Sequence, residues 1–466
     1  NVNDARKSCL QSKYAEDDSR NYIYQPKITN GGINMKLSKV FAAALSCGIL
    51  LNTAVTAVPS DVRAEETVTI KYWNFPNFTS DSEFKTSEEY DAALIKAFEA
   101  KNPGIKVEYQ KIDFTDGPAK IETAIQSKTN PDVIYDAPGR VIDWASKGYL
   151  APFKDVDTSK LNESAVKASS FEDELYLYPQ GIAPFLMAVN TKLTDKLGVT
   201  DLLPFEKEGR NWTPEEFQKF LEAVHEKDKD LIPTVVYAKS AAGDQGPRAF
   251  VSNLYGSWIT NDEVNKYTIN DENGVKALQW IREQAPKGII GQGAALEAKD
   301  ALEYFKSGKS PLSILASPGL YAQWKSVEDL NVRFLPFPNA NKSPKYEYLV
   351  AGPAVFDNGD DKKIEAAQKF VDFMINDPEW GTRTLKATGN FSAQKGVKGL
   401  YDNEELKFAE GLSDHFGAYY NTIPGYAKMR PLWFPMLQGV LSGQGDVKEL
   451  VDSYVEQAQA TYEEAK

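Results

Sequence analysis

The chain has 466 residues, of which 42% are hydrophobic and 26% charged, as in folded proteins with more than one core. Its formal net charge of −13 argues against nucleic acid and anionic membranes as partners, and favours a neutral or cationic ligand. Both cysteines, Cys9 and Cys47, precede residue 65, and only two histidines occur. The remaining chain therefore offers no zinc–thiolate site or cysteine nucleophile, and we expect no metal and no cofactor.

The first 64 residues are predicted to carry an export signal. From Met35, two lysines precede an apolar run that ends near Val58, and residues 62–64 fit a signal-peptidase site. We predict a signal peptide over 35–64, with a non-native extension over 1–34. The protein is then expected in the periplasm or at the outer face of the cytoplasmic membrane. Soluble export is favoured over a lipid anchor at Cys47, because the residues before it form a poor lipobox.

Beyond residue 65, short strand-like runs alternate with helical ones. The periodicity first predicts strands over 67–73, 105–112 and 132–135, and helices over 87–101 and 119–127. Later it predicts strands over 233–238, 312–316 and 332–336, and helices over 215–224, 275–284, 362–375 and 447–465. This alternation predicts an α/β fold with a parallel sheet covered by helices on both faces.

The three early strands end in side chains suited to a ligand. Trp73 and Asn74 end the first strand, Asp113 follows the second, and Asp136 and Arg140 follow the third. Open α/β sheets bind ligands at the carboxyl ends of their strands. Sugars need aromatic planes for their ring faces and carboxylates or amides for their hydroxyls. As alternatives, Trp73 fills the core, and Asp136 and Arg140 form a structural ion pair.

Several segments, in this order and spacing, resemble a known family. AFEAKNPGIKVEYQKIDF, SKTNPDVIYDAPGRVIDWASKGYLAPF and YFKSGKSPLSILASPGLYAQW are similar to the family 1 extracellular solute-binding proteins, the maltose-binding-protein-like receptors of ABC importers. The resemblance implies a two-lobed periplasmic-binding-protein-like fold of type II, each lobe a central sheet flanked by helices, with a hinge between. It implies an N-lobe over 65–180 plus 336–380 and a C-lobe over 181–335 plus 381–466.

The resemblance also implies a function and further site residues. The function is capture of a sugar or oligosaccharide in the inter-lobe cleft by hinge closure, and delivery to the transmembrane subunits of an ABC permease. The protein is expected to be a monomer without enzymatic activity. A peptide, polyamine or osmolyte is the alternative solute, and a secreted carbohydrate-active enzyme with Asp113 and Asp136 is a further alternative. By position, the resemblance adds to the cleft Ser317, Tyr321, Trp324, Gly352, Asn390 and Trp433.

Overall fold

The computed structural model describes residues 67–114, 116–239 and 243–466. The expected extension and signal peptide, with Cys9 and Cys47, lie outside these ranges. The described residues belong to one compact unit, Ala64–Lys466. Among them, we find no helix with the length and apolar character needed to cross a membrane.

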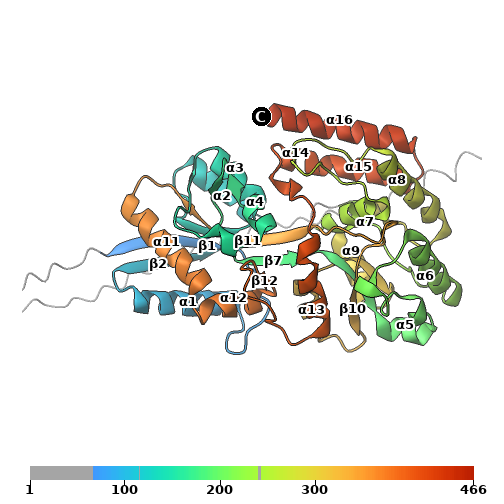
Figure 1. The fold of residues 1–466 in the computed structure, drawn as a ribbon, viewed down its shortest axis with the longest axis horizontal. Helices are drawn as coiled ribbons and strands as arrows, with labels where there is room; N and C mark the ends of the chain where they lie inside the picture. The colour runs from blue at the N-terminus through green and yellow to red at the C-terminus, as the bar shows by residue number, and fades with distance from the viewer. Residues whose placement is uncertain (1–66, 115, 240–242) are drawn as a thin grey trace, which may run out of the picture. The chain divides into compact units, whose positions relative to one another are not determined.

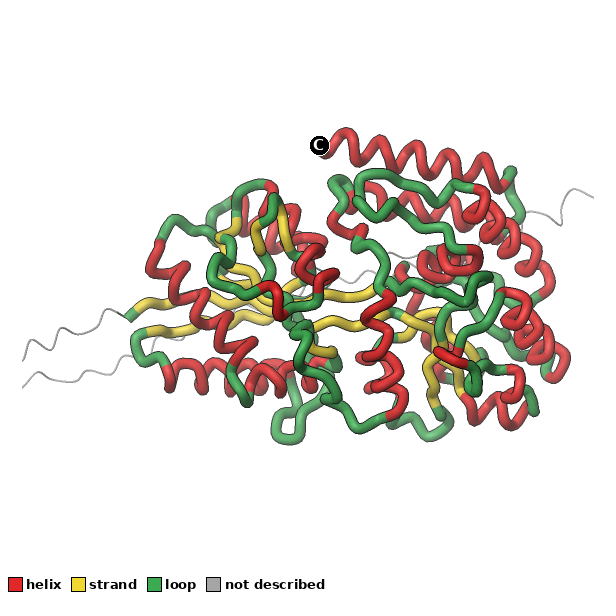
Figure 2. The backbone as a smooth tube through the Cα atoms, in the orientation of Figure 1, coloured by secondary structure: helices red, strands yellow, loops and turns green. Residues whose placement is uncertain are grey.

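Strands and helices alternate along the first part of the chain, as the periodicity predicts (Figures 1 and 2). The strands are β1 (Val68–Asn74), β2 (Ile105–Lys111), β3 (Val133–Asp136), β4 (Leu150–Ala151), β5 (Ser170–Phe171), β6 (Glu174–Leu175), β7 (Gly181–Pro184), β8 (Leu186–Asn190), β9 (Leu312–Ala316), β10 (Val332–Leu335), β11 (Tyr348–Phe356) and β12 (Phe391–Ser392). The helices are α1 (Ser87–Lys101), α2 (Gly117–Gln126), α3 (Pro138–Ser146), α4 (Glu163–Ala168), α5 (Thr191–Leu197), α6 (Pro214–Lys227), α7 (Gln245–Tyr255), α8 (Glu272–Gln284), α9 (Ala298–Lys306), α10 (Pro318–Trp324), α11 (Asp361–Asn376), α12 (Trp380–Thr388), α13 (Glu404–Glu410), α14 (Tyr426–Met429), α15 (Trp433–Leu441) and α16 (Val447–Ala465).

The larger sheet is mixed. Its strand order is β12-β7-β11-β3-β1-β2, and β4 pairs with β11. The predicted parallel pairing is confirmed for β1 with β2 and β3, whereas β11 runs antiparallel to β3. In Figure 1, α1, α11 and α12 lie on one side of this sheet, and α2, α3 and α4 lie on the other. Helices on both faces force the strands between them to be buried, which explains why all four residues of β3 are buried.

The structure contradicts two predictions for the second part of the chain. The smaller sheet has the order β10-β8-β9, and both pairings are antiparallel, so the prediction of a parallel sheet is wrong here. The predicted strand over 233–238 is also wrong. This segment is extended and buried, but Val236 N donates to Ile290 O (3.1 Å) and Ala238 N to Gly293 O (3.1 Å), in a loop and a short 3-10 turn. The apolar composition of this segment correctly indicates that it is buried. It is not a strand, because its backbone bonds to a loop and a 3-10 turn rather than to another strand.

Two strands join the lobes. The first half of β11 pairs with β7, and its second half pairs with β3 and β4. From β7 the chain continues through Phe185 into β8 of the smaller sheet. Figure 1 shows β7 and β11 between the two groups of elements. A bend in this strand pair would therefore move one sheet relative to the other.

The contacts of two segments near the lobe borders show which sheet each segment packs with. The Tyr90 hydroxyl on α1 lies 2.8 Å from Thr384 Oγ1 on α12, and the rings of Tyr90 and Trp380 lie 5.6 Å apart. Helix α12 therefore packs with the larger sheet. Residues 336–347 instead contact the smaller sheet's side, where Asn339 Nδ2 donates to Asn253 O (2.7 Å) on α7.

Candidate functional site

The end of β3 carries a buried carboxylate that is fully engaged. Arg140 donates from Nε to Asp136 Oδ2 (2.7 Å) and from Nη2 to Oδ1 (2.5 Å), and Ala137 N donates to Oδ1 (2.8 Å). Burial opposes the charge on Arg140, but Asp136 outweighs it, and the pKa of Arg140 is raised. The Asp136 side chain is 3% exposed, against 38% for Arg140. The ion-pair alternative therefore holds in the structure, and it fixes a guanidinium face at this strand end.

An aromatic stack continues from this guanidinium. The Arg140 guanidinium carbon lies 5.1 Å from the Phe75 ring centroid, and Phe75 stacks on Phe114 with centroids 5.0 Å apart. Phe114 is 59% exposed, whereas Trp73 is 8% exposed, with Lys120 Nζ 5.6 Å from its ring centroid. Phe114 was not among the predicted site residues, although it lies two positions after the end of the strand predicted over 105–112.

The other two strand-end residues have local partners. Asp113 is exposed, and its Oδ1 accepts from Asp116 N (3.0 Å). Asn74 Nδ2 lies 3.3 and 3.2 Å from the two carboxylate oxygens of Asp91 on α1. Asn74 and Asp91 line a small cavity of about 30 Å³ inside the N-lobe. In this structure, Asn74 therefore orders the N-lobe interior.

The C-lobe approaches the N-lobe at the start of α3. A β-carbon built on Gly139 would lie 3.3 Å from the carbonyl oxygen of Asn421. Asn421 belongs to a short 3-10 helix, Tyr420–Thr422. The two lobes thus meet beside the predicted strand-end residues.

A second contact between the lobes flanks a larger cavity. Gly389 ends α12 with a left-handed φ of 71°, and a β-carbon on it would lie 3.4 Å from Gly319 Cα at the start of α10. Beside this contact lies a cavity of about 380 Å³. Its walls come from both lobes and from the chain that crosses between them, and they include Thr79, Ser80, Pro318, Tyr321, Ala322, Lys325, Lys386, Gly389, Leu400, Tyr401, Asp402, Asn403 and Leu406.

Two tyrosine rings in this cavity are held in place. The Tyr321 ring packs on Phe334 with centroids 5.2 Å apart, and Asn403 Nδ2 donates to its hydroxyl (3.0 Å). The Tyr321 hydroxyl therefore keeps its own proton for an acceptor in the cavity. The Tyr401 hydroxyl is directed at the carbonyls of Asn390 (2.7 Å) and Leu385 (3.0 Å). Fixed aromatic rings beside hydrogen-bonding groups suit a ligand with both apolar faces and hydroxyls.

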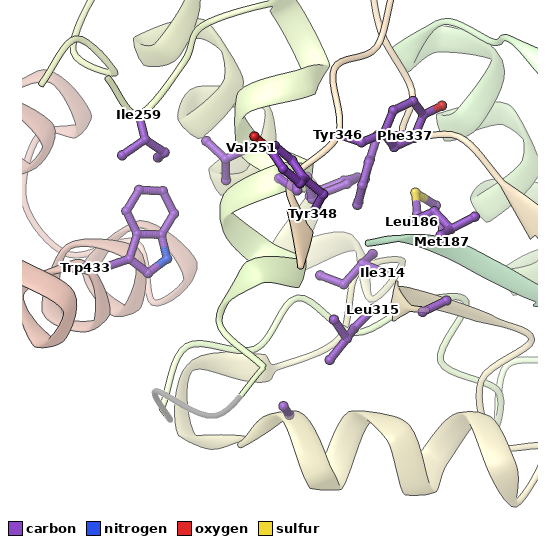
Figure 3. Close-up of a cluster of buried hydrophobic side chains, with 14 of the residues drawn as sticks. Leu186, Met187, Val251, Ile259, Ile314, Leu315, Phe337, Tyr346, Tyr348 and Trp433 are labelled. Carbon is purple, nitrogen blue, oxygen red and sulfur yellow. The ribbon is translucent and has the colours of Figure 1, made fainter. Parts of the chain in front are cut away.

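Two predicted tryptophans lie in the C-lobe core. Trp324 is 4% exposed and packs on Phe305 with centroids 4.8 Å apart. Trp433 is 1% exposed and packs edge to face on Tyr454 at 5.4 Å. Figure 3 shows Trp433 beside Ile259 in the apolar cluster. The structure does not bring these two indoles to the cavity walls.

The remaining predicted residues have backbone or capping roles. Ser317 caps α10, with its Oγ accepting from Leu320 N (3.2 Å). Asn390 is buried and donates to Thr388 Oγ1 (3.0 Å). A β-carbon on Gly352 would lie 2.0 Å from Tyr178 O, so the close approach made there is between neighbouring chain segments. Ser317 and Asn390 each adjoin a residue of the cavity wall, Pro318 and Gly389 respectively.

Comparison with known proteins places this arrangement in a family. Residues 84–379 match the model of the bacterial extracellular solute-binding protein family. A maltooligosaccharide ABC transporter solute-binding lipoprotein of Streptococcus pneumoniae (strain ATCC BAA-255 / R6) is 23% identical over 395 residues, which cover 79% of this chain and 85% of the relative.

Solved structures share the two-lobed fold. The GacH receptor of Streptomyces glaucescens GLA.O, solved unliganded and with acarbose, aligns with a TM-score of 0.69 and 21% identity over 86% of this chain and 100% of that chain. The cyclic alpha-maltosyl-1,6-maltose binding protein of Arthrobacter globiformis aligns with a TM-score of 0.70 and 17% identity over 85% and 100%. The predicted periplasmic-binding-protein-like fold is confirmed. With its family match over more than half of its length, this chain belongs to the bacterial extracellular solute-binding proteins.

Proposed function

We propose that this protein captures a sugar or oligosaccharide in the 380 Å³ cavity between its lobes and passes it to the membrane subunits of an ABC importer. The cavity is the main observation that supports this proposal. Both lobes line it, and Tyr321 and Tyr401 offer ring faces beside hydroxyl and amide groups. The S. pneumoniae relative, named for maltooligosaccharide, supports a saccharide over a peptide, polyamine or osmolyte.

Capture is proposed to occur by hinge closure on β7 and β11. A solute that touches both walls favours the closed arrangement, because only that arrangement provides both sets of contacts. The packing of α12 and of residues 336–347 supports an N-lobe that includes α12 and a C-lobe that includes 336–347. In this proposal, Asp136, Arg140, Trp73 and Phe114 lie on the N-lobe beside the α3 contact and outside the walls of the 380 Å³ cavity, while Trp324 and Trp433 act through packing.

The protein is proposed to bind its solute without covalent change. The family's members are binding proteins, and both oxygens of Asp136 are engaged by Arg140, so Asp136 is a poor partner for Asp113 in glycoside hydrolysis. We propose that the protein acts as an exported monomer outside the cytoplasmic membrane, with an ABC permease as its partner.

Calorimetric titration of the purified protein with mono- and oligosaccharides tests the proposal. Denaturation of the same protein with and without the sugar gives a second measure of binding. A true ligand at a hundred times its dissociation constant should add about 2.7 kcal/mol to the free energy of unfolding. Chromatography of the same mixtures should show no new reducing ends. Binding of peptides or polyamines in place of every saccharide would contradict the proposal, and so would release of product.

Tyr321→Ala should weaken saccharide binding about tenfold, or about 1.4 kcal/mol, because it removes a ring face and a hydroxyl from the cavity. Tyr321→Phe should retain more of the affinity, since only the hydroxyl is lost. Tyr149, which is 40% exposed and absent from the cavity walls, provides the control Tyr149→Ala. Equal affinities for the two alanine variants would remove Tyr321 from the site.

Gly139→Val should hinder closure, because its β-carbon would already lie 3.3 Å from Asn421 O and its branches would come closer still. We expect a several-fold loss of affinity and a smaller ligand-induced decrease in the radius of gyration by X-ray scattering. Gly411→Val is the control, because nothing lies within 4 Å of a β-carbon there and its φ is −65°. If both variants compact normally with ligand, the α3 contact plays no part in closure.

A further inference from the structure

The inter-lobe cavity presents two lysines from opposite lobes. Lys386 lies on α12 of the N-lobe, and Lys325 follows α10 of the C-lobe. Both lysines are exposed, and in the described part of the chain neither ammonium group has an ion pair or a hydrogen-bond acceptor. The carboxylate in the cavity wall, Asp402, already has Lys407 Nζ at 3.1 Å from its Oδ1. The cavity therefore carries uncompensated positive charge.

This local charge is opposite in sign to that of the whole chain, which has 66 acidic and 53 basic residues. Some exposed lysines pair within a helix, as Lys147 does with Asp143 (2.6 Å) and Lys369 with Glu365 (2.8 Å), whereas Lys325 and Lys386 have no such partner among the described residues. Both lysines are exposed, so water and salt screen the repulsion between their ammonium groups. An anionic group bound between the lobes would be attracted to both of them.

We infer that the captured solute is an acidic saccharide, with a carboxylate or sulfate group held between Lys325 and Lys386 and its sugar rings against Tyr321 and Tyr401. This inference rests on the proposed sugar-binding function and narrows its substrate class. It also replaces the expectation of a neutral or cationic ligand, because the net charge of a chain does not determine the charge of one cavity. An ammonium group acts as a point charge, so it serves carboxylate and sulfate alike.

Matched pairs of ligands test the inference by calorimetry: glucuronate with glucose, trigalacturonate with its methyl ester, and 3′-sulfolactose with lactose. The acidic member of at least one pair should bind at least tenfold more tightly than its neutral partner. That preference should decrease as salt rises from 20 to 300 mM, since salt screens charge at an accessible cavity. The pair that shows it distinguishes a carboxylate from a sulfate ligand.

Variants of the two lysines test whether these side chains cause the preference for the acidic ligand. Lys325→Gln and Lys386→Gln should each reduce the acid-to-neutral ratio several-fold, and the double variant should bring it close to one. Lys96→Gln, at an exposed position of α1 outside the cavity, should leave it unchanged. A neutral sugar that binds as tightly as its acidic partner would overturn the inference while leaving sugar capture intact. Failure of every saccharide in both calorimetric panels would overturn sugar capture as well.

Discussion

Asp244→Ala should lower the free energy of unfolding by about 3–5 kcal/mol, because it removes one partner from a buried ion cluster. Asp244 accepts from Arg430 Nε (2.7 Å) and Nη2 (2.7 Å), and its carboxylate also pairs with Arg248. The Arg248 side chain is 0% exposed, and that of Arg430 is 29% exposed. After the substitution, Glu347, 3.5 Å from Arg248 Nη2, is the carboxylate left to compensate the buried Arg248 guanidinium.

Urea denaturation followed by circular dichroism measures this loss. The matched control is Asp329→Ala, which removes an ion pair with Lys192 whose side chains are 87% and 54% exposed. That control should cost about 0–1 kcal/mol. Adding Arg248→Met to Asp244→Ala should recover part of the loss, because the charge that needed compensation is then absent. If Asp244→Ala costs no more than the control, the cluster does not stabilise the C-lobe.

The cluster also shows what the sequence could not reveal. Asp244 and Arg248 are four residues apart, but Glu347 and Arg430 come from distant parts of the chain, and each alone resembles an ordinary surface charge. Periodicity, in contrast, predicted elements whose signals are local. Helix α1 has the predicted ends, because Asn102-Pro103-Gly104 stops it, and α16 matches its predicted range of 447–465. Pairing partners are not local, which is why the antiparallel smaller sheet was not predicted.

In the candidate site, too, local sequence patterns do not determine which residues reach the cavity. Tyr321 and Trp433 were both predicted by position from the family resemblance, yet the cavity contains Tyr321 while Trp433 lies in the core. An aromatic residue near a strand or helix end satisfies either role, and only tertiary packing separates them. Lys386, near the end of α12, has the pattern of a solvated helix face. Its place in the cavity depends on how α12 approaches α10, which no local pattern contains.

The free energy of unfolding should fall by about 2.4 kcal/mol between pH 4 and pH 7 through Asp91 alone. Burial, with a smaller contribution from Glu88, raises the pKa of Asp91 from 3.8 to about 6, against the opposing effects of Tyr109 and Asn74. The folded chain therefore holds this proton more tightly than the unfolded chain. Between about pH 4 and pH 6, folding takes up a proton, so a rising pH removes stability, and the loss is complete above that window.

Asp91→Asn should remove this dependence, because an amide has the shape of the carboxylic acid and no charge. The variant should be about 2–3 kcal/mol more stable than the natural chain at pH 8, with the difference vanishing toward pH 4. Urea denaturation across this range measures both curves.

A control of opposite sign comes from the same lobe. The hydrogen bond from Arg383 chiefly lowers the pKa of Asp81 from 3.8 to about 2. Asp81→Asn should therefore lose stability above about pH 4, and the loss should fade as pH falls through about 2. A common surface effect of adding amides would move both variants in one direction. Opposite signs at Asp91 and Asp81 would show that the local surroundings of each carboxyl decide the outcome, and parallel curves would contradict the buried, proton-holding role of Asp91.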